Sequence, residues 1–174
     1  MKSGGVIYLD RHVLGCNNGA ISNFKLGLLD NDTKFQYTYG CAAGGDLKRI
    51  DLSKDTGSLT TPFVDMGDKE GQVSALEAHN VACANDEVLA QFKLHRGTGD
   101  GFNSHQYKYW CAKSNKTLKC RNDTTIPFTK SVDPGDLKLH HVKCLDSEAL
   151  GSFQLVSSAT DSTKRQYKYT CCRY

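Results

Sequence analysis

The eight cysteines of this chain are the residues whose number and spacing most restrict its chemistry. No two of them have the Cys-x-x-Cys spacing of a zinc site. Cytosolic chains rarely carry so many cysteines unless they bind metal. The even count therefore predicts a disulfide framework, in which adjacent cysteines near residue 174 bridge to two different partners. The eight residues are Cys16, Cys41, Cys83, Cys111, Cys120, Cys144, Cys171 and Cys172.

Three histidines, His12, His79 and His140, each stand four residues before a cysteine. Three imidazoles can bind zinc and leave one coordination position open. We favour a structural interpretation, in which each histidine hydrogen-bonds a neighbouring repeat, because repetition places equivalent residues on separate walls of a fold. The pair His140-His141 also lacks a suitably spaced carboxylate or cysteine partner. We expect no metal and no cofactor.

Acidic residues offer a second kind of chemistry, because two carboxylates that flank a cleft can act as acid and base. The candidates are Asp65 and Asp68 in Asp-Met-Gly-Asp, and Asp133 and Asp136 in Asp-Pro-Gly-Asp. Both sequences are typical of turns. The glycine-rich segment 97–101 lacks the following Lys-Thr of a phosphate-binding loop. No Ser-His-Asp or Cys-His arrangement stands out, so we expect no enzymatic activity.

The pattern Gln-Tyr-x-Tyr-x-Cys, which must position these residues, occurs at 36–41, 106–111 and 166–171. Its two tyrosines and its cysteine alternate with other residues and lie on one face of a strand. Such tyrosines could stack on sugar rings. We favour core packing, because they share a face with bridged cysteines. The residues between the tyrosines, Thr38, Lys108 and Lys168, should face solvent.

Matching segments surround each copy of this pattern and define an internal repeat. A strand-like block at 6–9, 73–76 or 137–139 precedes the His-to-Cys segment, and a Phe-x-Leu strand follows a polar turn. We expect an all-β, pseudo-threefold single domain over 1–174, with about four short strands in each repeat. The repeats span about 6–70, 71–134 and 135–174. The N-terminal strand should complete the last repeat, so that N- and C-terminal segments pair and remove exposed sheet edges.

Repeat equivalence also proposes disulfide pairs, although sequence alone does not determine connectivity. Three equivalent bridges would be Cys16–Cys41, Cys83–Cys111 and Cys144–Cys171, with Cys120 bonded to Cys172. Exchange of Cys171 and Cys172 between these bridges is an equally serious alternative.

Three sequons, at Asn31, Asn115 and Asn122, lie in segments that we interpret as polar turns and could carry N-linked glycans. Together with the cysteines they predict a secreted, extracellular glycoprotein. Residues 1–5 show no signal-peptide pattern, so we expect either a removed leader or a segment of a longer chain. The net charge of +3 comes without a basic stripe, so we expect no nucleic-acid partner. No apolar run reaches the roughly 18 residues of a membrane helix, so we expect no membrane insertion.

The order of cysteine, turn, x-Phe-x-Leu, polar loop and Tyr-x-Cys resembles the repeat of the vitelline membrane outer layer protein I family. The ending Cys171-Cys172-Arg173 resembles that family too. The chain has a single tryptophan, Trp110, and lacks the Trp-Gly-rich strands that open the family's repeats. The resemblance implies a β-prism of three four-stranded Greek-key sheets around a pseudo-threefold axis, closed by disulfides. A β-trefoil is the alternative three-repeat fold.

These features predict a structural module of an extracellular coat, an egg envelope or a cell-surface matrix. The alternative is a lectin-like module that binds glycans through loops at one end, near Asn103 or Asp161. The expected partners are extracellular glycoproteins or glycans, including further copies of the chain.

Overall fold

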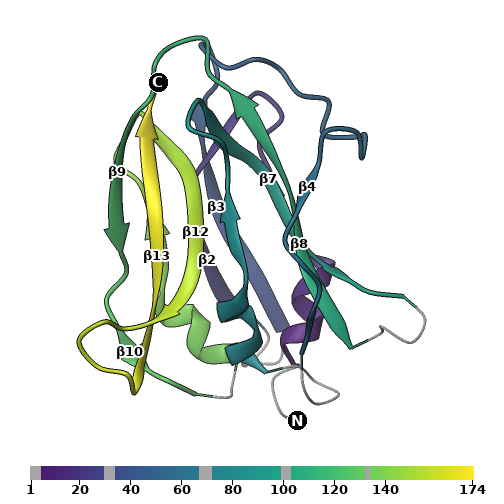
Figure 1. Ribbon diagram of the computed structural model, residues 1–174, viewed down its shortest axis with the longest axis vertical. Coiled ribbons are helices and arrows are strands. Elements are labelled where there is room, and N and C mark those ends of the chain that lie inside the picture. The colour runs from purple at the N-terminus through teal and green to yellow at the C-terminus, as the bar shows by residue number, and fades with distance from the viewer. Residues whose placement is uncertain (1–4, 30–33, 67–71, 99–102, 132–133) are drawn as a thin grey trace.

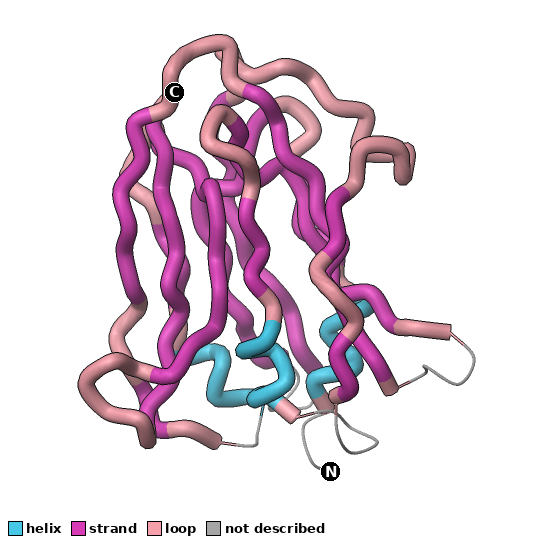
Figure 2. Tube along the Cα trace, viewed as in Figure 1, coloured by secondary structure: helices cyan, strands magenta, loops and turns pink. Residues whose placement is uncertain are grey.

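The computed structural model describes residues 5–29, 34–66, 72–98, 103–131 and 134–174. The fold is all-β and contains three antiparallel sheets. Each sheet is built on one long hairpin, and these hairpins run along the long axis of the molecule (Figures 1 and 2). The hairpins are β2 (Gly19–Leu29) with β3 (Lys34–Ala43), β7 (Glu87–Arg96) with β8 (Ser104–Lys113), and β12 (Glu148–Ser157) with β13 (Lys164–Arg173).

Each hairpin receives a short strand from the preceding repeat in cyclic order. The short strands are β1 (Val13–Gly15), β6 (Asn80–Ala82) and β11 (His141–Lys143). Strand β1 pairs with β7, β6 pairs with β12, and β11 pairs with β2. This exchange links the three repeats into a closed ring. The expected pairing of the N- and C-terminal segments is therefore wrong, because the ring closes through β11 and β2 instead.

The ends of the chain also lie apart: η1, near the N-terminus, is at the lower end of the molecule and the C-terminus is at the upper end (Figure 1). Repeat 3 is completed by β6 of repeat 2, and the N-terminal strand does not complete it.

Two of the sheets have further strands on the outer edge of their hairpin. In the first sheet, β8 pairs with β4 (Leu59–Thr60) and β5 (Val64–Asp65). In the second sheet, β13 pairs with β9 (Lys119–Thr124) and β10 (Phe128–Thr129). The third sheet has the order β11-β2-β3. The expectation of four strands in every sheet is thus wrong within the described residues, because two sheets have five strands and the third has three.

Three 3-10 helices replace the strands that we expected at the start of each repeat. They are η1 (Val6–Arg11), η2 (Val73–Ala78) and η4 (Pro134–Leu139), and they lie at the lower end in Figure 2. Val6 and Leu9 are buried, as are Val73 and Leu76, and both pairs are three residues apart. This spacing matches the three residues per turn of a 3-10 helix. The expectation of a strand at the start of each repeat is therefore wrong. No helix among the described residues is long and apolar enough to cross a bilayer.

The main core lies between the inner faces of the three sheets. Each sheet contributes one phenylalanine, and the three rings of Phe24, Phe92 and Phe153 contact one another with centroids 4.8–5.2 Å apart. All three side chains are buried. Edge-to-face ring contacts of this kind add to the free energy gained from burial. The Phe-x-Leu strands therefore face inward, as the sequence predicts.

A second hydrophobic cluster, rich in alanine, lies at the end of the hairpins away from the 3-10 helices. Each hairpin has a β-bulge at the equivalent position, next to this cluster. A bulge shifts the alternation of side chains by one residue. For that reason Ile21 and Phe24, which are three residues apart on either side of the bulge, both lie in the main core. Ala20 lies on the opposite face of the strand from Ile21 and is buried in the second cluster. Leu47, Ile50 and Leu52, from the segment between β3 and β4, also belong to this cluster or pack against it. That segment crosses the upper end of the molecule (Figure 1).

Candidate functional site

Three of the four disulfides form a ring of covalent links between the sheets. Cys16–Cys41 joins the end of β1 in the first sheet to β3 in the third. Cys83–Cys111 joins the end of β6 in the second sheet to β8 in the first, and Cys144–Cys171 joins the end of β11 in the third to β13 in the second. Every junction between two sheets thus has one disulfide.

The fourth disulfide, Cys120–Cys172, lies within the second sheet and joins β9 to β13. These four pairs are the ones that repeat equivalence proposes, and Cys171 and Cys172 are not exchanged. All eight cysteines are oxidised. Four disulfides indicate an oxidising environment, such as that outside the cell.

The three equivalent histidines lie at three different junctions and each contacts the first tyrosine of its own repeat. The ring centroids of His12 and Tyr37 are 5.9 Å apart, those of His79 and Tyr107 are 5.5 Å apart, and those of His140 and Tyr167 are 5.7 Å apart. Two of the histidines also meet a buried threonine, with Nδ1 2.8 Å from the Thr61 hydroxyl and 3.0 Å from the Thr125 hydroxyl. The structure thus uses these histidines to pack the junctions and does not bring them together.

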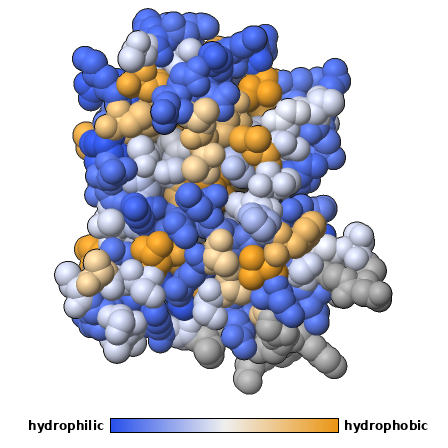
Figure 3. Space-filling view, viewed as in Figure 1, coloured by the Kyte–Doolittle hydropathy of each residue, from blue (hydrophilic) through white to orange (hydrophobic). Residues whose placement is uncertain are grey.

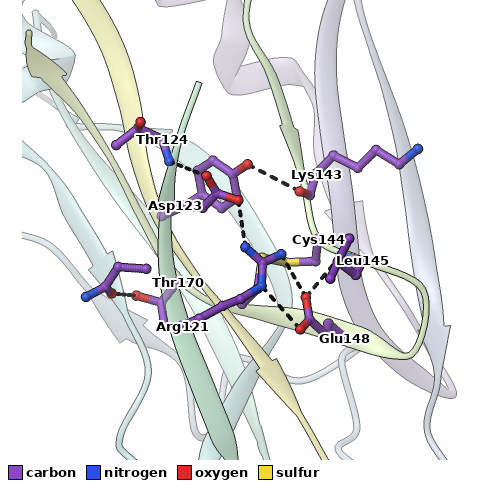
Figure 4. A network of polar contacts seen from close by, with 11 residues as sticks. Arg121, Asp123, Thr124, Lys143, Cys144, Leu145, Glu148 and Thr170 are labelled. Atoms are coloured by element: carbon purple, nitrogen blue, oxygen red, sulfur yellow. Dashed lines mark hydrogen bonds and ion pairs between the residues drawn. A yellow bond between two sulfur atoms is a disulfide. The ribbon is translucent and has the colours of Figure 1, made fainter. Parts of the chain in front are cut away.

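A buried group of Cys144, Glu148 and Cys171 has metal-like spacing in the described part of the chain. The two cysteines form a disulfide, so their sulfur atoms cannot act as thiolate ligands. Glu148 instead accepts a bidentate hydrogen bond from Arg121, at 3.3 Å and 3.0 Å, and one from the Leu145 amide at 3.1 Å (Figure 4). Arg121 also donates to Asp123 at 2.7 Å. This network holds β9 against the start of β12.

The charge of Arg121 lowers the pKa of Glu148 and Asp123, mainly through these hydrogen bonds. We predict that Glu148→Gln destabilises the chain by about 2 kcal/mol at pH 7, because the buried Glu148 carboxylate accepts charge-assisted hydrogen bonds from Arg121 that a neutral amide does not replace in full. A lowered carboxyl pKa contributes stability above the unfolded-state value and loses it as the pH falls. The difference between variant and parent should therefore shrink below about pH 4.

Urea unfolding at pH 7 and at low pH measures this difference. Asp86→Asn is the matched control, because the Asp86–Lys113 pair is exposed on both sides. Exposed pairs contribute at most about 1 kcal/mol. Equal losses for the two variants would contradict the importance of the buried network.

His105 is fully buried at the lower end of the fold, and neither ring nitrogen has a hydrogen-bond partner within the described ranges. It occupies the place of Phe35 and Arg165 in the other repeats. Burial lowers the pKa of His105, and the Arg96 charge lowers it further, against the weaker opposing effects of the Asn103 backbone, which is near the ring but not placed for a well-formed hydrogen bond, and of the Asp10 charge. Burial is also the main cause of the lowered pKa values of His79 and His140. All three side chains are therefore neutral when folded at neutral pH.

We predict that the free energy of unfolding falls as the pH is lowered from about 6.5, because unfolded histidines then bind protons that the buried ones do not. The loss should continue down to the lowered folded-state pKa values. His105→Phe copies the residue of repeat 1 and should make this dependence shallower, whereas the exposed control His95→Phe should leave it unchanged. Urea midpoints between pH 8 and pH 5 test this. A parent midpoint that is flat over that range would refute the prediction.

Most tyrosines of the repeated pattern lie in the core, as we favoured. Tyr107, Tyr109, Tyr167 and Tyr169 are buried, whereas Tyr39 in repeat 1 is 42% exposed. Of the residues between the tyrosines, Thr38 and Lys168 are exposed. Lys108 is only partly exposed, because it lies near the face of Trp110 and pairs with Asp55 at 2.7 Å.

The structure describes one member of each acidic candidate pair. Asp65 is exposed on β5, and Asp136 is half-buried in η4. Asp68 and Asp133 lie outside the described residues, as does most of the glycine-rich segment 97–101. Each of the two candidate pairs therefore has only one member among the described residues.

The sequons differ in their surroundings. Asn115 is exposed in a bend after β8, as a polar turn requires. Asn122 is exposed too, but it lies within β9, where its side-chain oxygen accepts a hydrogen bond from Thr170 at 2.9 Å. The expectation of a turn at Asn122 is wrong, because Lys119–Thr124 pairs with β13. Asn31 lies outside the described residues.

A cavity of about 360 Å³ opens at the upper end of the molecule, beneath the segment that follows β3. Its polar lining comes from Asn17, Asn18, Lys48 and Arg49, and Arg49 donates to the Asn18 side-chain oxygen at 3.0 Å. The lining includes apolar residues such as Ile50 but no aromatic or acidic side chain. Amides and cations of this kind can bind hydroxyl or anionic groups.

The cavity lies at the end opposite the hairpin loops on which we placed a lectin site. The described loop around Asp161 and the segment after β7 lie on opposite sides of the lower end (Figure 1). Asp161 accepts hydrogen bonds within its own turn, from the Thr163 amide and side chain. In the sequence, the turn Asn17-Asn18-Gly19 and the pair Gly44-Gly45 mark the segments that line the cavity. These segments are far apart in the chain, so their proximity could not be predicted without the fold.

The visible face in Figure 3 is mostly hydrophilic, with small separate apolar areas. Exposed apolar residues of the chain include Phe63 and Ile126, in segments that flank the edges of the sheets. No protein family, curated protein or solved structure was found to match the chain.

Proposed function

We propose that this chain is a secreted structural module of an extracellular coat, such as an egg envelope or a cell-surface matrix. The observation that carries the proposal is the ring of three disulfides, each of which joins a different pair of sheets. A protein that persists outside the cell benefits from bonds that oppose unfolding, because its unfolded form is degraded or aggregates. A covalent ring around the whole core serves that requirement.

The arrangement that we propose is a pseudo-threefold β-prism, similar to that of the vitelline membrane outer layer protein I family. The contacts among Phe24, Phe92 and Phe153 and the cyclic exchange of short strands support it. In a prism the three sheets form three walls around an axis, and equivalent residues meet only at that axis. The phenylalanines meet, whereas the histidines lie at separate junctions.

The polar groups of the interior also favour a structural role. Buried His79 and His140 contact threonines, and buried Glu148 is held by Arg121. These side chains are the ones that could have acted as ligands, acids or bases, yet they connect one strand to the next. Their partners are internal, so the proposal assigns them to stability rather than to catalysis.

A lectin-like module is the second candidate, and the cavity lined by Asn17, Asn18 and Arg49 is the observation that favours it. Asparagine amides and guanidinium groups donate hydrogen bonds to sugar hydroxyls or carboxylates. The lining offers no aromatic ring on which a sugar could stack. For that reason we rank glycan binding below the structural role.

Two measurements on the oxidised chain separate the candidates. Sedimentation velocity over increasing protein concentration reports self-assembly, and a panel of neutral and acidic glycans reports sugar binding. We expect the sedimentation coefficient to rise with concentration and no glycan to bind saturably. Arg49→Ala should leave the assembly unchanged.

Saturable binding of one glycan that Arg49→Ala abolishes, by a chain that stays monomeric, would replace the structural proposal with the lectin-like one. Lys113→Ala is the matched control for a lost surface cation, because Lys113 does not line the cavity.

A further inference from the structure

The outer edge of β3, which faces away from β2, has no partner strand within the residues that the structure describes. The equivalent edges of β8 and β13 are covered, by β4 and β5 and by β9 and β10 (Figure 1). Strand β3 is ten residues long. An uncovered edge of this length presents a row of backbone donors and acceptors to any extended segment.

Two aromatic side chains beside this open edge of β3 are more exposed than their equivalents. Tyr39 is 42% exposed, compared with 8% for Tyr109 and 5% for Tyr169. His12 is half-buried, whereas His79 and His140 are buried. The histidine and the two tyrosines are the same at all three junctions, whereas a covering strand is present at only two of them within the described residues.

The two covered edges show what kind of strand fits. Thr61 donates its amide N–H to the Tyr107 carbonyl at 3.0 Å, and its hydroxyl accepts from the Tyr107 amide at 2.9 Å. Thr125 makes the same two bonds to Tyr167, both at 2.9 Å. In each case the threonine hydroxyl also contacts a histidine. In both cases one threonine therefore connects the tyrosine strand to the histidine through hydrogen bonds.

The tyrosine and histidine that such a threonine would contact are already in place on the open edge. Tyr37 is opposite Leu26, just as Tyr107 is opposite Leu94 and Tyr167 is opposite Leu155. By this equivalence the backbone N–H and C=O of Tyr37 point away from β2. The edge-on contact between Tyr37 and His12 matches the other two junctions. Little reorganisation is needed before a strand binds, which favours binding.

We propose that the open edge of β3 binds an extended antiparallel strand of a second protein, with a threonine opposite Tyr37. The two internal strands define its chemistry. One reads Thr60-Thr61-Pro62-Phe63, and the other reads Thr124-Thr125-Ile126-Pro127-Phe128. The partner strand is therefore two threonines followed, directly or after one residue, by proline and phenylalanine. Main-chain hydrogen bonds supply affinity in this mode and side-chain positions supply specificity. The proposal does not depend on the structural role, because a glycan-binding module would have the same edge.

The test titrates a synthetic peptide with the sequence of residues 118–130, carrying Cys120→Ser, into the oxidised 174-residue chain. We expect saturable one-to-one binding and slower hydrogen exchange at the Tyr37 amide. A peptide with Thr125→Val keeps the shape but lacks the hydroxyl, and should bind about tenfold more weakly. In the chain, His12→Phe keeps the ring and removes Nδ1, and should weaken the parent peptide by a similar factor. His141→Phe, on the opposite edge strand of the same sheet, is the control and should not.

Three outcomes would overturn the proposal. The first is no binding by a chain whose circular dichroism and urea midpoint show that it is folded. The second is equal binding of the parent peptide and its Thr125→Val form. The third is a dimer, formed without peptide, in which the Tyr37 amide is already protected; the occupant would then be a second copy of this chain.

Discussion

Complete reduction of the four disulfides is expected to unfold the chain at neutral pH without denaturant. The bridges join cysteines 25 to 52 residues apart. In the chain-entropy model each loop of this size contributes about 3–4 kcal/mol by restricting the unfolded state. Together the four contribute on the order of ten kcal/mol, which is comparable to the 5–15 kcal/mol stability of a typical domain. The remaining noncovalent contacts should not keep the native state populated.

Fluorescence of the single tryptophan is a suitable measurement, because Trp110 is buried and donates its indole N–H to the Lys54 carbonyl at 3.2 Å. On reduction its emission should move to longer wavelength and the near-ultraviolet circular dichroism should vanish. The double variant Cys120→Ala with Cys172→Ala is the control, because it removes one bridge within a sheet and leaves the ring between sheets intact. It should stay folded, with about 3–4 kcal/mol less stability. A fully reduced chain that still unfolds cooperatively would show that the noncovalent core suffices.

The hairpins and two of the four disulfide pairs could be predicted from the sequence because both depend on alternation and repetition, whereas the choice between Cys171 and Cys172 for the other two pairs required the structure. Phe24 and Leu26 share a face with each other, and the Tyr-x-Tyr-x-Cys strand shares a face with its own cysteine. The equivalent Cys16–Cys41 and Cys83–Cys111 pairs then follow from equal positions in the repeats. Local patterns of this kind can be recognised in the sequence without knowledge of the tertiary structure.

What the sequence missed depends on contacts between distant segments. The exchange of β1, β6 and β11 between repeats leaves no local trace, because a three-residue strand pairs equally well with its own hairpin or the next one. The 3-10 helices were missed for a local reason, because an uninterrupted run such as Val6-Ile7-Tyr8-Leu9 is rich in the β-branched and aromatic residues that favour strands. His105 shows a third limit. Its position gave no signal, since repeats 1 and 3 place Phe35 and Arg165 there.

Replacement of Phe153 by alanine is expected to cost about 4 kcal/mol of unfolding free energy, because it opens a cavity where three sheets meet. Phe63→Ala is the control, since Phe63 is 50% exposed and its loss should cost under about 1 kcal/mol. Urea unfolding of the oxidised chain at neutral pH measures both.

The double variant Phe92→Ala with Phe153→Ala tests whether the sheets share one axis. These two rings are 4.8 Å apart and come from different sheets. Contacting residues show coupling of about 0.5–3 kcal/mol, whereas independent sites add within about 0.5 kcal/mol. We expect the double loss to differ from additivity by about 1 kcal/mol, as aromatic pairs do in mutant cycles. Additive losses, or a Phe153→Ala variant as stable as Phe63→Ala, would mean that the three phenylalanines do not form a common core. The proposed prism would then lose one of its two sets of central aromatic contacts. The other set joins the same three sheets, because Tyr37, Tyr107 and Tyr167 contact Phe92, Phe153 and Phe24 in turn.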